Sequence, residues 1–230
     1  MPRARTFKSE NRQTAATQNR GGCLSLFSLP LFAILFIACL LTVLAFNTPI
    51  STSAASYQAD STVPTTSLSP IFTREVQYWA DDIHKWANAS SLDPNLVAVV
   101  MQIESCGNPF ARSSAGAMGL FQVMPYHFQS GENPYETNTN ALRGLNYLSN
   151  SLNTAYGNVR LTLAGYNGGI GVISRGEWTW SAQTLRYVYY GAPIYEDARN
   201  GAVSSAKLDE WYRKYGAGLC REASQKLGID

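Results

Sequence analysis

Glu104 is the side chain whose type and expected position favour proton-transfer chemistry. The sequence predicts a helix from Asp93, an N-cap residue followed by proline, to about Ser105. Glu104 therefore falls on the last turn of that helix, where the carbonyl end of the helix dipole disfavours a negative charge. Partial burial would favour the protonated acid further. A carboxyl group that keeps its proton near neutral pH can deliver it to a leaving oxygen, which is the task of a general acid.

The residues after Glu104 decide between that chemistry and an ordinary solvated glutamate, which is the simpler interpretation of a helix-end position alone. Gly107-Asn108-Pro109 ends the helix, and small residues rich in glycine and alanine follow at 113–119. Such a segment brings the backbone close to whatever the acid touches. We therefore predict that Glu104 lines a functional site.

Other chemistries have weaker support. Cys106 and His127 could form a thiol nucleophile and its base, but Cys106 follows the end of a helix, where the dipole disfavours a thiolate. A disulfide between Cys106 and Cys220, the two cysteines outside the apolar N-terminal segment, is favoured over two separate buried thiols. The two histidines of the chain are not at ligand spacing, and the glycines at 168–171 lack the sequence of a phosphate loop. We expect no metal and no cofactor.

Helical periodicity dominates the rest of the sequence. Apolar residues recur at steps of three and four, which is typical of amphipathic helices. The predicted helices cover 76–87, 93–105, 140–156, 158–168 and parts of 181–190 and 205–226. Residues 71–230 are therefore expected to form a single globular, mainly helical domain, with enough chain to bury one sizeable core.

The N-terminal part of the chain differs from this domain in charge and composition. Residues 1–22 carry five cations and one anion, residues 23–46 are almost wholly apolar, and residues 47–70 are rich in Ser, Thr, Ala and Pro. A helix of that apolar length spans about 36 Å, against roughly 30 Å for the hydrocarbon core of a bilayer. We predict a basic cytoplasmic tail at 1–22, a single-pass transmembrane signal-anchor helix at 23–46 and a solvated linker at 47–70. The domain at 71–230 would then lie outside the cytoplasm, tethered to the cell membrane.

Two alternatives apply to the apolar segment. A signal peptide cleaved near Ser53-Ala54-Ala55 is disfavoured, because its apolar region is typically only about 7–15 residues long. Lipidation of Cys39 is disfavoured because the apolar run continues past it. The net charge of +2 has its surplus in the N-terminal tail, which argues against a nucleic-acid-binding domain.

Four sequence blocks, in order, resemble the soluble lytic transglycosylases, which are lysozyme-like enzymes that cleave peptidoglycan. The first block is Glu-Ser-Cys-Gly-Asn-Pro at 104–109 with Gly-Ala-Met-Gly-Leu-Phe-Gln-Val-Met-Pro at 116–125. The others are Asn-Pro-Tyr at 133–135 with Asn-x-x-x-Gly-x-x-Tyr-Leu at 140–148, Ala-Gly-Tyr-Asn-Gly-Gly at 164–169, and Gln-Thr-x-x-Tyr-Val at 183–188. Each shorter piece is a weak signal alone, but their joint order over roughly residues 92–190 is improbable by chance.

The resemblance implies roles for individual positions. Glu104 would be the sole catalytic acid and base. The substrate-binding side chains would be Ser113, Met118, Gln122, Tyr166, Asn167 and Tyr187. Met118 and Phe121 would supply apolar walls, although core packing explains these two equally well. The implied fold is lysozyme-like, mainly α with a minor hairpin (α+β).

The resemblance also implies a reaction on peptidoglycan glycan strands. Glu104 would protonate the glycosidic oxygen between MurNAc and GlcNAc. It would then take the proton from the C6 hydroxyl of the same muramic acid, which closes a 1,6-anhydro ring without a second carboxylate. The alternatives are a hydrolytic muramidase, which uses water instead, and an inactive glycan-binding module, against which the retained Glu104, Gln122, Tyr166 and Asn167 argue. The expected partners are the glycan strand and the membrane; a link to cell-envelope machinery is left open.

Overall fold

The computed structural model describes residues 68–229. The predicted tail at 1–22, the transmembrane helix at 23–46 and all but the last residues of the linker at 47–70 lie outside the described residues. Within 68–229, no helix combines the length and the apolar character that crossing a membrane requires.

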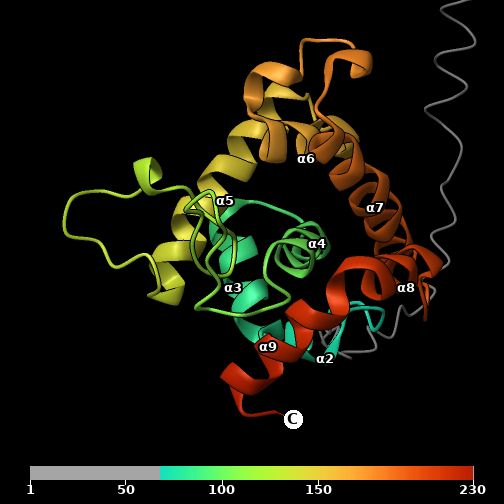
Figure 1. Ribbon diagram of the computed structural model, residues 1–230. Helices are drawn as coiled ribbons and strands as arrows, with labels where there is room; N and C mark the ends of the chain where they lie inside the picture. The colour runs from blue at the N-terminus through green and yellow to red at the C-terminus, as the bar shows by residue number, and fades with distance from the viewer. Residues whose placement is uncertain (1–67, 230) are drawn as a thin grey trace, which may run out of the picture. The chain divides into compact units, whose positions relative to one another are not determined.

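Helices make up nearly all of the regular structure (Figure 1). The α-helices are α2 (Arg74–Gln77), α3 (Ala80–Ser90), α4 (Pro94–Glu104), α5 (Thr137–Thr154), α6 (Val159–Gly168), α7 (Ala182–Arg199), α8 (Ala206–Trp211) and α9 (Ala217–Leu227). Single turns of 3-10 helix are η1 (Pro125–His127), η2 (Ile170–Val172) and η3 (Glu177–Thr179), and η4 (Tyr212–Gly216) is a π-helical turn. The prediction of a mainly helical, single globular domain is therefore confirmed.

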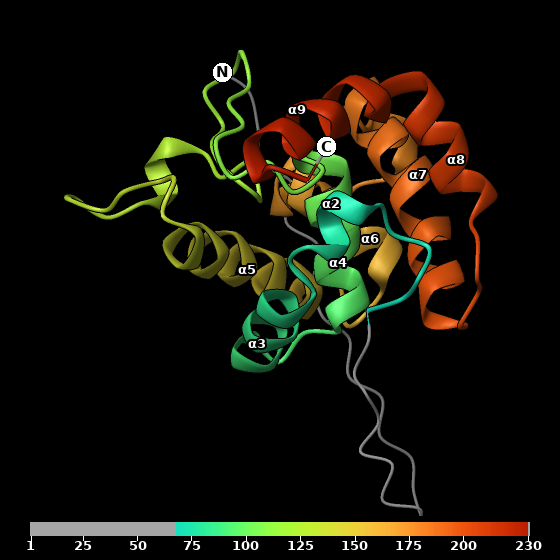
Figure 2. The ribbon, with the colours of Figure 1, turned by 90° about the horizontal axis from the view of Figure 1, so that it is seen from below.

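Helix α4 is the centre of the domain. Every residue from Leu96 to Gln102 is buried, as expected of a helix that is apolar nearly all round. Asp93 caps the helix by accepting a hydrogen bond from the Asn95 backbone N–H at 2.8 Å, and Pro94 occupies the first turn. Figures 1 and 2 place α3 and α5 on one side of α4 and α7 and α8 on the other. The C-terminal end of α4, which carries Glu104, is therefore held between these two groups.

The observed helices differ from the predicted ones in several places. The segment 76–87 is split into α2 and α3 at Trp79, whose indole N–H donates to the Gly107 carbonyl at 2.9 Å. Helix α5 starts at Thr137, earlier than predicted, because the Glu136 carboxylate accepts from the backbone N–H groups of the first turn. Helix α7 continues past residue 190 to Arg199, and the segment 205–226 contains the π-helical turn η4.

The minor hairpin that the lysozyme-like resemblance implied is not formed as strands in residues 68–229. Two isolated antiparallel bridges take its place, between Arg112 and Met118 and between Met118 and Val123. The loop turns too tightly for a ladder, because Gly116, Gly119 and Gln122 all have positive φ.

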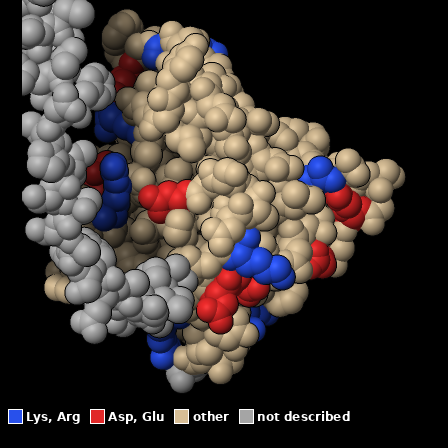
Figure 3. Space-filling model, turned by 180° about the vertical axis from the view of Figure 1, so that it is seen from behind, with Lys and Arg blue, Asp and Glu red and all other residues tan. Residues whose placement is uncertain are grey.

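Charge on the domain surface is dispersed on the side that Figure 3 shows. Lys, Arg, Asp and Glu lie there in small mixed groups on a largely uncharged surface. A nucleic-acid-binding face would carry a stripe of one sign.

Candidate active site

The loop between α4 and η1 is fixed to α5 by one buried amide. Asn140 accepts from the Phe121 backbone N–H at 2.9 Å and donates to the carbonyls of Met118 and Pro134 at 2.8 and 2.9 Å. Gly119 has φ +74°, and a Cβ there would lie 2.4 Å from the Asn140 side-chain nitrogen. Glycine is therefore required where the loop crosses α5.

The Gln122 side chain joins two parts of the same loop. Its side-chain nitrogen donates to the carbonyls of Ala111 and Gly119, at 3.1 and 3.0 Å. The residue has φ +45°, which is uncommon for a side chain with a Cβ, and these two bonds hold it in that conformation. Ser113 similarly accepts from the Ala117 N–H at 3.0 Å. Both side chains are thus positioned by the loop's own backbone.

Glu104 lies half-buried at the end of α4, and burial raises the pKa of its carboxyl from 4.5 to about 8. The Tyr187 hydroxyl, on α7, opposes part of that rise. The carboxyl is consequently protonated at neutral pH. The cause is desolvation by the surrounding side chains, whereas the sequence pointed first to the helix dipole.

Tyr187 is 6% exposed, and its hydroxyl has no hydrogen-bond partner within residues 68–229. An unpaired buried hydroxyl is costly, and this one is close enough to Glu104 to influence its pKa. The pKa of Tyr187 is raised well above 10 by burial and by the nearby carboxyl, so it is present as a neutral donor.

Helix α6 supplies Tyr166 and Asn167 at its last turn, before Gly169 ends it with φ +88°. The Tyr166 hydroxyl donates to the Phe121 carbonyl at 2.7 Å, and the Asn167 side-chain oxygen accepts from Thr184 on α7 at 3.1 Å. Burial raises the pKa of Tyr166 well above 10. These two bonds fix the end of α6 to the loop on one side and to α7 on the other.

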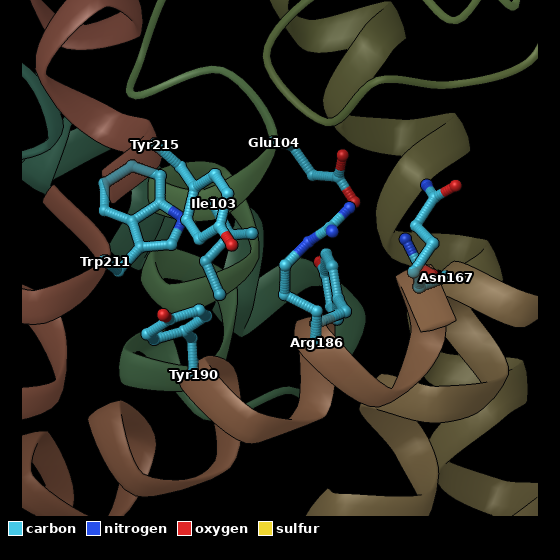
Figure 4. A pocket seen from close by; sticks show the side chains of 9 residues that line it. Ile103, Glu104, Asn167, Arg186, Tyr190, Trp211 and Tyr215 are labelled. Carbon is cyan, nitrogen blue, oxygen red and sulfur yellow. The ribbon is translucent and has the colours of Figure 1, made fainter. Parts of the chain in front are cut away.

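Two hollows meet at Glu104, and both are also lined by Asn167 and Gln183. The larger one, of about 430 Å³, is called here the polar hollow; its further lining includes Ser113, Gln122, Tyr126, His127, Tyr147 and Tyr166. The smaller one, of about 220 Å³, is called the aromatic hollow; its further lining is Ile103, Arg186, Tyr187, Tyr190, Trp211 and Tyr215. Figure 4 shows the three rings of Tyr190, Trp211 and Tyr215 gathered on one side of the aromatic hollow and Asn167 on the other. Glu104 thus lies where the two hollows adjoin, and together they are called the cleft.

Most of the side chains predicted for the site lie around this cleft. Ser113, Gln122, Tyr166 and Asn167 line the polar hollow with Glu104, and Tyr187 lines the aromatic hollow. Met118 lines neither hollow. Phe121 is fully buried in the core, with its ring edge-on to Trp86 at 6.1 Å, so core packing is the correct interpretation for it.

Sequence reasoning missed two groups of lining residues. The first is Tyr126, His127 and Tyr147, whose rings form a row along the polar hollow, with 4.6 Å between the first two centroids and 4.7 Å between the next two, and the row ends at the predicted Tyr166 at 5.8 Å from Tyr147. The second group is the aromatic hollow's Arg186, Tyr190, Trp211 and Tyr215. The available signal was helical spacing, since Tyr187 and Tyr190 are three residues apart and Trp211 and Tyr215 four.

Cys106 and Cys220 are joined by a disulfide, with Cα atoms 5.0 Å apart across 114 residues of sequence. Cys106 is thereby excluded as a nucleophile paired with His127. Within the described part of the chain, the side chains close enough together to hold a metal ion are Glu75, Cys106 and Cys220. The sulfurs of both cysteines are used by the disulfide. The bridge ties α9 to the residue two positions after Glu104.

The segment that carries most of this site matches a known family, since the description "Transglycosylase SLT domain" fits residues 81–184. A transglycosylase of Enterobacteria phage PRD1 is 38% identical over 47% of this chain and 40% of its own length. The membrane-bound lytic murein transglycosylase E of Buchnera aphidicola is 40% identical over 20% of this chain and 21% of its own length. The chain thus spans less than half of either relative.

Among solved structures, an inactive variant of the lytic transglycosylase Slt from Pseudomonas aeruginosa aligns at a TM-score of 0.39 and 19% identity. That alignment covers 64% of this chain and 24% of Slt, and a similarity this low has no bearing on the site. The family assignment depends on the sequence match. Residues 81–184 of this chain thus match the transglycosylase SLT domain family.

Proposed function

We propose that this chain is a peptidoglycan lytic transglycosylase, which cleaves the β-1,4 bond between MurNAc and GlcNAc and leaves a 1,6-anhydro-muramic acid end. The observation that carries the proposal is Glu104, a carboxyl with a pKa of about 8 at the junction of a two-part cleft. The match of residues 81–184 to the family supports it.

The first step uses the proton on Glu104. The acid donates it to the glycosidic oxygen, the bond from that oxygen to C1 of the muramic acid breaks, and GlcNAc leaves as the alcohol. Positive charge then develops at C1 while Glu104 becomes a carboxylate. In the second step this carboxylate takes the proton from the C6 hydroxyl, whose oxygen bonds to C1. Glu104 ends protonated again, and no water is consumed.

The cleft supports an internal nucleophile because, among the described residues, Glu104 is the one acid that lines either hollow. The acids considered from the sequence are engaged elsewhere: Asp93 accepts from Tyr195, Glu132 pairs with Arg143, Glu136 caps α5, and Glu177 pairs with Arg160. Retaining and inverting glycosidases need a second carboxylate roughly 5–9.5 Å from the first. A tethered hydroxyl, with an effective molarity of up to about 10⁵–10⁸ M, replaces it here.

The fixed polar groups around Glu104 would position the sugar. Tyr187 is a buried donor without a partner and faces the carboxyl from α7, so it stabilises the carboxylate that forms after proton transfer. Asn167 and Tyr166 would orient the N-acetyl group, and Ser113 and Gln122 would line the strand's path through the polar hollow. The row of rings from Tyr126 to Tyr166 offers faces on which sugars stack.

The finer architecture belongs to the same proposal. The domain at 71–230 would have a lysozyme-like arrangement, tethered outside the cytoplasm by the apolar segment 23–46 and the linker 47–70, with 1–22 in the cytoplasm. A flexible linker of that length spans about 25–29 Å, so cleavage would occur near the membrane surface. A cell-envelope assembly is the kind of partner that such a tether would serve.

Mass spectrometry of purified peptidoglycan after digestion tests the proposal. Anhydro-muramic acid ends are the expected result, and the Glu104→Gln variant should release none. Reducing muramic acid ends would instead identify a hydrolytic muramidase. Absence of any cleavage, with retained binding to the strands, would identify an inactive glycan-binding module.

A further inference from the structure

One wall of the cleft comes from outside the family segment. Residue 184 is the last that matches the family, whereas Arg186, Tyr190, Trp211 and Tyr215 of the aromatic hollow follow it. The α7 residue Tyr190 lies beside the α8–η4 residues Trp211 and Tyr215, and Arg186 comes from the preceding turn of α7 (Figure 4). What this wall binds is therefore a property of this chain's C-terminal helices.

The aromatic side of the hollow is built rigidly. Tyr215 lies on the π-helical turn η4, and its ring meets the ring of Tyr190 edge-on at 5.8 Å. The Trp211 indole packs on Gly216, where a Cβ would lie 2.4 Å from the ring, so glycine is required there. The Tyr190 hydroxyl is bonded to Glu210 at 3.2 Å. π-Helical turns often occur at functional sites, and this one sets the ring of Tyr215 at the edge of the hollow.

Arg186 is an exposed cation whose charge is not neutralised by the described residues. Its guanidinium carbon lies 5.3 Å from the centre of the Tyr215 ring, a cation–π contact that holds the side chain over the rim. Neither an ion pair nor a hydrogen bond joins Arg186 to another residue in 68–229, whereas Arg143 and Arg160 each pair with a glutamate. The acid in the same hollow, Glu104, is neutral at pH 7 and does not compete for this guanidinium.

The hollow also has an exit. Arg186, Tyr190 and Tyr215 line a third space of about 440 Å³, together with Arg160, Leu185 and Tyr189. A substituent of a sugar bound at Glu104 can therefore pass Arg186 and extend into this third space along α7.

We propose that Arg186, supported by Tyr215, binds a carboxylate carried by the muramyl unit of the substrate. An arginine fork on an aromatic face matches a planar carboxylate, and the muramyl unit carries one either on its lactyl group or on its peptide stem. The third space gives a peptide stem room to leave the cleft. This inference rests on the proposed function, and it adds a substrate-recognition site built by residues that follow residue 184.

Binding to three ligands tests it, in the full chain carrying Glu104→Gln so that no ligand is cleaved. The ligands are glycan fragments with peptide stems, glycan fragments without stems, which expose the lactyl carboxylate, and chitooligosaccharides, which have no carboxylate. Adding Arg186→Gln should weaken binding of at least one carboxylate-bearing ligand about tenfold and leave the chitooligosaccharide unchanged. Adding Arg221→Gln, which removes an exposed arginine outside the cleft, is the matched control and should change none.

The three ligands separate the outcomes. A loss confined to stem-bearing fragments assigns the carboxylate to the peptide, a loss confined to stem-free fragments assigns it to the lactyl group, and a loss with both shows that the site accepts either. Equal affinities with and without Arg186, or an equal loss with the chitooligosaccharide, would overturn the inference. If the chain with Glu104→Gln alone binds none of the three ligands, the proposed function itself is contradicted, and the inference falls with it.

Discussion

The polar and aromatic hollows share Glu104 but are built in different ways. One side of the polar hollow is formed by a loop whose backbone is held by side chains close in sequence, such as Gln122 bonded to the Ala111 and Gly119 carbonyls, and the rest comes from α5, α6 and the start of α7. The aromatic hollow is formed by side chains from α4, α7, α8 and η4, which are up to 112 residues apart (Ile103 to Tyr215). The first can be recognised from short motifs, whereas the second depends on how distant helices pack.

The difference also separates two tasks. Under the proposed function, the polar hollow and Glu104 hold the reacting sugar, and this half lies almost wholly inside the family segment. The aromatic hollow lies mostly outside it and would select what the sugar carries. Variants on the two sides should therefore affect different measurements.

The largest expected effect is that of Glu104→Gln on turnover. Because the same carboxyl acts as acid and then as base, we expect the rate of muropeptide release to fall by at least about 10²–10⁴-fold. Glu132→Gln is a matched control, since Glu132 is paired with Arg143 and lines neither hollow. Wild-type rates with Glu104→Gln would remove the basis for the proposed mechanism.

The next effect concerns the disulfide that ties the two regions together. Replacing Cys106 and Cys220 by serine frees a loop of 114 residues in the unfolded chain, and we expect stability to fall by about 4 kcal/mol. Urea unfolding with and without reductant measures this. We expect binding of carboxylate-bearing fragments to weaken as well, because α9 follows η4 directly. Unchanged unfolding midpoints would show that the bridge contributes little to either region.

A smaller effect is the pH dependence of stability. The pKa of Glu104 is about 8 in the folded domain and returns to about 4.5 on unfolding, so the folded state retains a proton that the unfolded state has released. The contribution of Glu104 to the free energy of unfolding is therefore fully present below about pH 4.5 and is lost as pH rises through about 8.

Glu104→Gln should remove this dependence. Because the side chain is partly open to solvent, we expect the variant to gain about 1–2 kcal/mol over wild type at pH 8 and close to none at pH 4.5. Thermal unfolding of both proteins at several pH values in this range measures the difference in stability. The other titrating groups are the same in both proteins, so their effects cancel in that difference. Parallel curves for the two proteins would contradict the raised pKa.

The smallest effect is that of Tyr187→Phe. The Tyr187 hydroxyl lowers the pKa of Glu104, so its removal should move the alkaline limb of kcat/KM to higher pH, by less than about one pH unit. Stability should not fall, since the hydroxyl is without a partner in residues 68–229. Tyr190→Phe, which removes a hydroxyl bonded to Glu210, should leave that limb in place. Coincident limbs in all three proteins would show that Tyr187 has no influence on the acid.

The sequence predicted the mainly helical character of the domain and part of the polar hollow's lining, because both depend on local patterns. Helix α4 was recognisable from its cap at Asp93 and its apolar repeat, and Gly119 and Gln122 mark a loop that only a few sequences can form. The break before α3 was not recognisable, because the apolar repeat continues through it, and the indole of Trp79 at the break bonds to Gly107, 28 residues away. The predicted N-terminal membrane segment stays a prediction, outside the described residues.

The sequence by itself predicted which carboxyl is the candidate acid and which short motifs surround it, because residue type and spacing define a helix end and a tight glycine loop. Only the tertiary structure decided why that acid keeps its proton. Its pKa rises because side chains from separate helices exclude water from it, which no local pattern encodes. The aromatic hollow has the same origin, since Arg186 and Tyr215 meet only where α7 packs against the C-terminal helices.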